Sequence, residues 1–274
     1  MYAAPHVIKE ISTDEDVLGL TSVDDELFAL LKQDVDQVAV YSINDYQLLR
    51  HLSVPGLEPD SDNDMTSCVR YKCLYMSDNN NRYIHRYDLS SSDMIKWRVR
   101  GSPVGLSVTP TCNLLVTCCG DTNKLVELSA YNGQCVREIT LQSDIRYPSH
   151  SVQVTTNSEL TSSQYVVCHG LTDSAGENLN RVCLVGDDGK VTRSYGGQRG
   201  SDVGHLNHPR HLAVDKDSQF FVADDVNSRV VVLSSTLEFV RCVKEKFPCR
   251  LYLHQATRRL FVSQAGGYVT VIQL

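Results

Sequence analysis

A pair of apolar strands recurs six times along this 274-residue sequence, and no other feature constrains the fold as strongly. The first strand of each pair starts 40 to 55 residues after the previous copy. The six copies are LFAL (Leu27–Leu30), LYMS (Leu74–Ser77), LLVT (Leu114–Thr117), YVVC (Tyr165–Cys168), FFVA (Phe220–Ala223) and LFVS (Leu260–Ser263). Repeats of this period are typical of a β-propeller, in which each sheet buries both of its faces against neighbouring sheets.

The fifth unit shows the make-up of one blade most clearly. Its predicted strands are Arg210–Val214, Phe220–Ala223, Val230–Leu233 and Phe239–Val243, with polar turn residues between them. Short apolar strands separated by turn signals form an antiparallel meander. The sequence therefore predicts one all-β domain over residues 1–274, a six-bladed β-propeller of four-stranded antiparallel blades. The blades are expected near residues 13–54, 66–99, 103–141, 148–196, 208–243 and 248–274.

The two ends of the chain indicate a closed ring. The sixth unit stops at Leu274, after its third strand, and the strand-like segment His6–Ser12 has no unit of its own. We expect this amino-terminal strand to complete the last blade and protect its edge. In the second blade, the innermost strand is expected near Cys68–Lys72.

Two motifs of the fifth unit resemble an NHL repeat. They are LNHPRHLAVD (Leu206–Asp215) and VADDVNSRVVVL (Val222–Leu233). Over its whole length the chain is similar to the C-terminal propellers of invertebrate tripartite-motif (TRIM-NHL-like) proteins. The resemblance implies a platform that recognises proteins or RNA, attached to other domains such as a RING, a B-box and a coiled coil. It also implies a role in recognising the substrates of a ubiquitin ligase.

Charge is unevenly distributed along the chain. Residues 1–65 hold 14 acidic and 3 basic side chains, whereas the rest hold 19 acidic and 23 basic ones. We interpret the acidic runs, including Glu58–Asp64 between the first two blades, as solvated segments. The alternative is an acidic sector of the disc that repels nucleic acid. No apolar run is long enough to span a membrane, and we expect no membrane or DNA partner.

The ten cysteines contain no CxxC pair, so the sequence carries neither a zinc knuckle nor a RING. Free cysteine behaves as a small buried hydrophobe. Cysteines predicted to be buried in strands are Cys73, Cys118, Cys168, Cys183 and Cys242. We therefore expect a reducing, cytoplasmic location, with a disulfide within either of two nearby cysteine pairs as the alternative.

Proline residues open the innermost strands of four blades and align them. The residues two positions later are Gly105, His150, His211 and Arg250, which we expect to converge on one face beside the axis. The candidate binding residues of this face are Arg146, His150, Arg199, His208, Arg210, His211, Arg229 and Arg250. A structural role for each of them is the alternative, since buried polar groups must be hydrogen-bonded.

The sequence predicts a non-enzymatic module that recognises a protein partner through this face, with arginine donors to carboxylates or backbone. One alternative is single-stranded RNA, with Tyr147 available for stacking. A second alternative is a metal-dependent hydrolase or lyase, for which His150 and His211 provide half a site without a matching carboxylate. No catalytic motif is present, and no catalytic residue, metal or cofactor is predicted.

Overall fold

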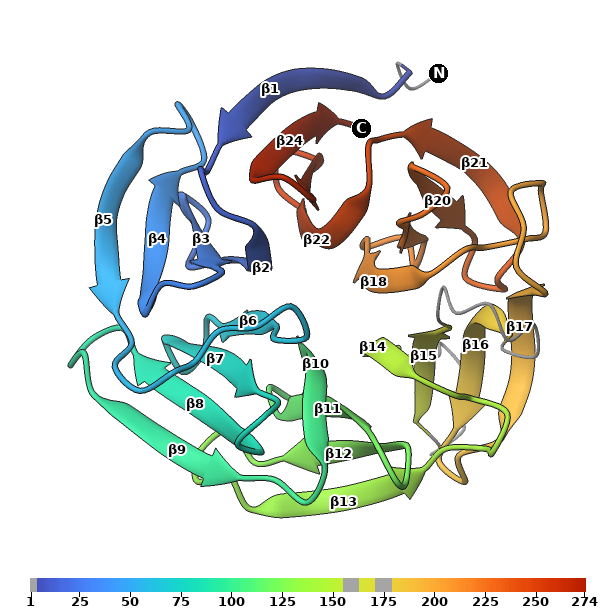
Figure 1. Cartoon of the computed structure of the whole chain (residues 1–274), viewed down its shortest axis with the longest axis horizontal. Helices are drawn as coiled ribbons and strands as arrows, with labels where there is room; N and C mark the ends of the chain where they lie inside the picture. Colours follow the sequence, from blue (N-terminus) through green and yellow to red (C-terminus); the bar gives the residue numbers. More distant parts are fainter. Residues whose placement is uncertain (1–3, 155–162, 171–178) are drawn as a thin grey trace.

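Six four-stranded antiparallel sheets stand around a central axis in the computed structural model of the chain (Figure 1). The structure describes residues 4–154, 163–170 and 179–274. Consecutive strands are hydrogen-bonded neighbours, so each sheet is a meander from the axis to the rim. The predicted all-β, six-bladed architecture is confirmed. The described part of the chain contains no helical segment capable of crossing a membrane.

The first three blades are continuous in sequence. Blade 1 consists of β2 (Val17–Ser22), β3 (Leu27–Lys32), β4 (Gln37–Ser42) and β5 (Leu48–Ser53). Blade 2 consists of β6 (Met65–Cys68), β7 (Cys73–Asp78), β8 (Tyr83–Asp88) and β9 (Met94–Arg98). Blade 3 consists of β10 (Ser102–Val108), β11 (Leu114–Cys119), β12 (Lys124–Leu128) and β13 (Cys135–Thr140).

The remaining blades complete the circle. Blade 4 consists of β14 (Pro148–Val154), β15 (Gln164–His169), β16 (Asn180–Gly186) and β17 (Val191–Gly197). Blade 5 consists of β18 (Pro209–Val214), β19 (Phe220–Asp224), β20 (Arg229–Leu233) and β21 (Phe239–Lys244). Blade 6 consists of β22 (Pro248–His254), β23 (Arg259–Gln264), β24 (Tyr268–Gln273) and, from the other end of the chain, β1 (His6–Ser12).

The amino-terminal strand closes the ring as predicted. β1 pairs antiparallel with β24, from His6 opposite Gln273 to Ser12 opposite Tyr268. Figure 1 shows β1 lying along the outside of the last blade. Because the first and last segments of the chain share one sheet, the ring cannot open without breaking this strand pair.

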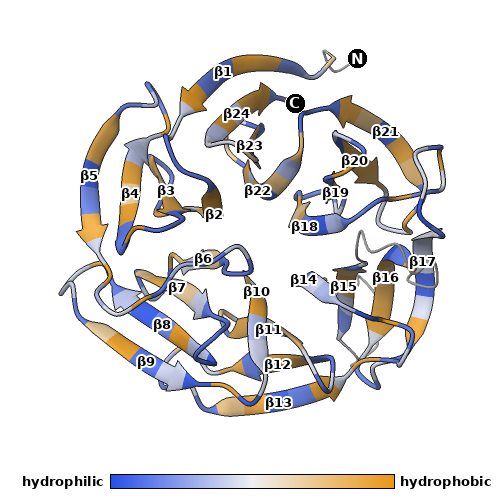
Figure 2. Ribbon diagram, in the orientation of Figure 1, coloured by the Kyte–Doolittle hydropathy of each residue, from blue (hydrophilic) through white to orange (hydrophobic). Residues whose placement is uncertain are grey.

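The hydrophobic core lies between the blades rather than at the axis. Six buried clusters are found among the described residues, and each joins two neighbouring sheets. At the closure, Phe28 of blade 1 packs on Phe261 of blade 6 with 4.9 Å between ring centroids. In Figure 2 the outer strands alternate between hydrophilic and hydrophobic residues, because only one of their faces is covered.

Two sequence-based predictions need correction. The innermost strand of blade 2 is β6, which begins at Met65, and not Cys68–Lys72. The reason is burial: Met65 faces the core, whereas Val69 is exposed in the turn that leads to β7. All ten cysteines are free, but Cys242 is exposed because it lies on the rim strand β21.

Candidate functional site

Polar side chains reach the axis because the innermost strands are bulged near their first residues. The pairing register of β14 shifts between Pro148 and His150, and that of β22 shifts between Pro248 and Arg250. β18 has the equivalent shift around His211. A β-bulge bends its strand and re-aims a side chain. The same irregularity in three blades therefore directs two imidazoles and a guanidinium to the centre of the ring.

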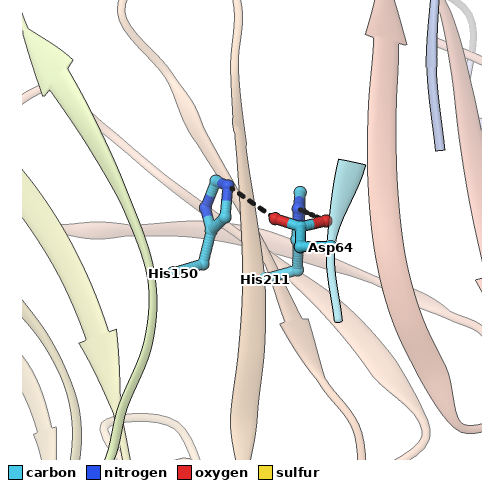
Figure 3. Close-up of side chains that lie close together, drawn as sticks. All are labelled: Asp64, His150 and His211. Atoms are coloured by element: carbon cyan, nitrogen blue, oxygen red, sulfur yellow. Dashed lines mark ion pairs between the residues drawn. The ribbon is translucent and has the colours of Figure 1, made fainter. Parts of the chain in front are cut away.

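Asp64, His150 and His211 meet at this centre, each from a different blade (Figure 3). One potential ligand atom of each side chain lies within 4.8 Å of those of the other two. The Nε2 atoms of His150 and His211 are each 3.7 Å from a carboxylate oxygen of Asp64. The two imidazole rings stack with 3.8 Å between their centroids. We call these three buried residues the axial trio.

Backbone contacts hold the carboxylate of Asp64 in place. The Leu106 N–H donates to Asp64 Oδ2 at 2.8 Å, and the Asp64 N–H donates to Ser77 Oγ at 2.8 Å. The other carboxylate oxygen, Oδ1, accepts no hydrogen bond from the described residues. A buried carboxylate oxygen without a donor is unusual and can indicate an absent ion or water.

Arg250 balances the negative charge of Asp64 at the axis. Its Nε lies 3.5 Å from Asp64 Oδ1, but its short hydrogen bonds go to backbone carbonyls. Nε donates to Leu18 O and Nη2 donates to Asn63 O, both at 2.7 Å. The guanidinium is therefore anchored to blades 1 and 2, and its charge would weaken the binding of a cation by the trio.

Burial sets the protonation of the trio. It lowers the pKa of His150 to about 3, and the nearby charges of His211 and Arg250 act in the same direction. Burial also lowers the pKa of His211 against the attraction of Asp64. Burial raises the pKa of Asp64, but attraction to His211, Arg250 and His150 outweighs it, so the pKa lies below its ordinary value. Near neutral pH the trio therefore offers two neutral imidazoles and one carboxylate, the forms that ligate metals.

The hydrogen bonds of the rings decide which nitrogens can ligate. His150 Nε2 donates to the Leu106 carbonyl at 3.0 Å, and its Nδ1 has no partner. A ring N–H bonded to a carbonyl opposite a free lone pair is the usual arrangement of a ligating histidine. His211 Nδ1 accepts from the Leu251 N–H at 3.3 Å, so its neutral ring carries the proton on Nε2. His211 ligates only when its ring turns over or loses that proton.

Two imidazoles and one carboxylate are a ligand set for zinc and other first-row transition metals. Asp64 Oδ1 and His150 Nδ1 have no hydrogen-bond partner among the described residues, but both histidines face the carboxylate through Nε2, so an ion bound by all three residues requires the imidazole rings to turn. Gly105 allows β10 to pack closely on β14, since a side chain there would overlap the Ser149 carbonyl and approach His150 Cα to 2.8 Å. The trio is therefore a candidate metal centre.

A pocket of about 410 Å³ opens beside the trio on the face where the innermost strands begin. Its polar lining includes His208, Arg210, Arg250, Tyr147 and Ser149. A second pocket of about 170 Å³ lies on the other side of the trio, lined mainly by apolar side chains together with both trio histidines. The trio histidines line the lower pocket and Arg250 lines the upper one, so the cluster lies between the two pockets.

The upper pocket contains a histidine oriented by a carboxylate. His208 Nδ1 lies 3.1 Å from Asp225 Oδ2. This contact orients the ring, and the other ring nitrogen, Nε2, takes no part in it. His208 also has a left-handed backbone, with φ of 62°, directly before a proline. Tyr147 and Phe247 have the same conformation before Pro148 and Pro248, so it belongs to the entry of the chain into these innermost strands.

Of the two guanidinium groups that line the upper pocket, that of Arg210 makes the longer contacts. Its Nη1 lies 3.7 Å from Asp225 Oδ2, and its Nη2 lies 3.4 Å from Ser61 O. Contacts of this length are weak, so its donors can turn to a bound anion.

The structure brings some of the predicted binding residues together and separates others. His208, Arg210 and Arg250 line the upper pocket, but His150 and His211 lie beneath it and not on an open face. Among the described lining residues, Arg146, Arg199 and Arg229 do not appear. Arg146 and Arg199 are exposed, and Arg229 is used inside blade 5.

Sequence reasoning missed Asp64 for two reasons. Blade 2 has no proline to align its innermost strand, and Asp64 ends the acidic run Glu58–Asp64 that we predicted to be solvated. That prediction was wrong for Asp64, which is 1% exposed. A usable signal was spacing, since Asp64 precedes Leu74 by ten residues just as Arg250 precedes Leu260.

Comparison with protein-family models and with curated protein sequences finds no match. Solved structures do resemble the chain. A catalytically inactive virginiamycin B lyase from Staphylococcus aureus with quinupristin has a TM-score of 0.68 at 11% identity, covering 99% of this chain and 100% of that one. A streptogramin B lyase has a TM-score of 0.65 at 12% identity, with coverages of 98% and 97%. Kuenenia stuttgartiensis hydrazine synthase has a TM-score of 0.66 at 12% identity, with coverages of 93% and 83%.

At this identity the likeness shows the propeller fold alone. The neighbours named here are enzymes and not tripartite-motif proteins, so the comparison supports the propeller but not its NHL identity. Our predicted function, a non-enzymatic module for a protein partner, was wrong by this comparison. The neighbours fit the second alternative, a propeller hydrolase or lyase.

Proposed function

We propose that the chain is a metal-dependent enzyme of the lyase or hydrolase type, with its reaction centre at the propeller axis. The observation that carries the proposal is the convergence of Asp64, His150 and His211 within 4.8 Å. These residues would hold a divalent cation. When bound, such a cation acts as a Lewis acid on a substrate oxygen.

The upper pocket supplies the remaining groups that such a reaction needs. Arg210, with its long contacts, would bind an anionic part of the substrate, and Arg250 lines the same pocket beside Asp64. His208 would transfer a proton through Nε2 while Asp225 holds its ring. The same residues serve elimination or hydrolysis, because both reactions need proton transfer and charge stabilisation.

The lyases among the structural neighbours suggest a first substrate to test. Quinupristin is present in one of those structures, so we would incubate it with the purified chain and an added divalent cation. Elimination adds no atoms to the substrate, whereas hydrolysis adds one water, and mass spectrometry of the products separates the two reactions. His208→Gln is expected to slow any such reaction by about 100-fold.

Cation binding tests the trio directly. After removal of bound metal with a chelator, titration calorimetry with Zn²⁺ or Mn²⁺ should show one site. Asp64→Asn and His150→Gln should each weaken it by at least about tenfold. His85→Gln is the matched control, since His85 is equally buried beside a carboxylate but lies in blade 2 away from the trio. Equal affinity in the wild type and Asp64→Asn would overturn the proposal.

The NHL identity of the repeats is also a proposal. It is supported within blade 5, where Asp224 accepts hydrogen bonds from Asn227 and Arg229 of the motif VADDVNSRVVVL.

A further inference from the structure

A third pocket lies on the upper face between blades 2 and 3. Its volume is about 400 Å³, close to that of the upper pocket, and the two pockets share Cys119 in their lining. Arg82 comes from the β7–β8 turn, Arg100 from the β9–β10 connection and Lys124 from the start of β12. Segments of two blades therefore converge on this pocket, which we call the inter-blade pocket.

The lining of the inter-blade pocket is strongly cationic. It contains four basic side chains, Arg82, Arg98, Arg100 and Lys124, and one acidic side chain, Asp121. Lys124 is neutralised by Glu138, with 2.8 Å between Nζ and Oε2. Three arginines therefore face a single acidic residue, in a chain whose net charge is −7.

The guanidinium groups of these three arginines make few polar contacts within the fold. Among the described residues, the guanidinium groups of Arg82 and Arg100 have neither a hydrogen bond nor an ion pair. Arg98 lies over the ring of Tyr83, 6.0 Å from its centroid, which keeps its edge donors available. This contrasts with Arg229 of blade 5, which makes three hydrogen bonds of 2.8 Å or less.

The backbone on one side of the pocket is open. Gly120 lines the pocket, and a side chain there would meet no atom within 4 Å. The space beside Gly120 is therefore open to a ligand, although the Gly120 N–H itself donates to Asn123 Oδ1 at 3.2 Å. The pocket thus offers guanidinium donors on one side and open space on another.

We propose that the inter-blade pocket binds a phosphate group. A guanidinium presents paired N–H donors that match the oxygens of phosphate, and three arginines suit a dianion better than a singly charged carboxylate. The phosphate can belong to a small phosphorylated molecule or to a phosphorylated protein segment, since the chemistry of recognition is the same. This site is independent of the proposed cation centre, because the two share no charged side chain.

The test uses calorimetric titration of the whole chain with three probes: inorganic phosphate, a short phosphoserine peptide and the same peptide without phosphate. The wild type should bind inorganic phosphate or the phosphopeptide, but not the unmodified peptide. The double variant Arg82→Gln/Arg100→Gln should lose at least about tenfold in affinity. All these arginines are exposed, so thermal unfolding should be unchanged.

The control is the double variant Arg50→Gln/Arg70→Gln, which removes the same charge from exposed positions outside the pocket. It should bind as the wild type does. An equal loss in both double variants would overturn the proposal, as would absence of phosphate and phosphopeptide binding by the wild type. Tighter binding of the phosphopeptide than of inorganic phosphate would identify a protein ligand, and equal binding a small molecule. Cation titration of Arg82→Gln/Arg100→Gln should be unaffected, which separates this site from the axial one.

Discussion

Burial, more than any neighbouring charge, governs the histidines of this propeller. It is the largest cause of the lowered pKa of His150, His169 and His211, which reaches about 3 in His150 and about 4 in His169. In the unfolded chain histidine titrates near its ordinary pKa of about 6.5. Below that pH these histidines bind protons in the unfolded chain but stay neutral in the folded chain.

The free energy of unfolding should therefore fall with pH below about 6.5, by roughly 1.4 kcal/mol per pH unit for each histidine that stays neutral. The sign follows from the lowered pKa: the contribution is fully present above the unfolded value and is lost as the pH falls towards the folded value. Urea unfolding between pH 7 and pH 4.5 measures the slope. His150→Gln should reduce it, whereas His51→Gln, at an exposed position, should not. Identical slopes in all three proteins would contradict this account.

At the scale of one element, the turn between β19 and β20 shows how a blade is tied to its neighbour. Asp224 is fully buried and accepts from the Asn207 N–H at 2.7 Å and from Arg229 Nε at 2.7 Å. Arg229 also donates to Ser201 O and His205 O in the loop that precedes blade 5. The motif residues therefore position the loop that leads into the upper pocket.

Arg229→Gln should destabilise the fold by about 3 kcal/mol, because it leaves the charge of Asp224 buried without its cationic partner. The measurement is the free energy of unfolding from urea titration. Arg193→Gln is the control, since exposed Arg193 makes one long hydrogen bond, at 3.4 Å to Thr236 O. A loss of similar size in both variants would show that the network has no special role.

At the scale of the whole molecule, the ring depends on one strand from each end of the chain. β1 is exposed along most of its length, and Ile11 is its buried residue, packed in the cluster between blades 6 and 1. The backbone of Thr13 continues the closure by donating to Gly267 O at 2.8 Å. Without β1, β24 becomes an unprotected edge strand, a site for pairing with other chains.

Ile11→Ser should therefore cost about 2–3 kcal/mol and lower Tm by roughly 5–10 °C. Ile8→Ser, on the exposed side of the same strand, should change stability by less than about 0.5 kcal/mol. Calorimetry gives both values, and light scattering on heating reports edge pairing, which we expect to rise in Ile11→Ser alone. Equal Tm values for the two variants would remove the support for closure by β1.

Much of the architecture could be predicted from local patterns. The strands from Leu27 and Phe220 lie where the repeated apolar segments indicate, because alternation and turn residues act over a few positions. The closing strand His6–Ser12 followed from counting strands. The shared position two residues after a proline also predicted that His150, His211 and Arg250 converge, as they do around Asp64.

By itself, then, the sequence determined the blades, their number and three of the four charged or titratable groups at the axis. Only the tertiary structure decided that Asp64 completes the cluster and that Asp225 orients His208. An acidic residue in an acidic run is ordinarily solvated, and only the ten-residue spacing from Leu74 distinguishes Asp64 from the rest of its run. Asp64 is buried because Arg250, 186 residues away in sequence and 3.5 Å away in space, balances its charge where the blades meet.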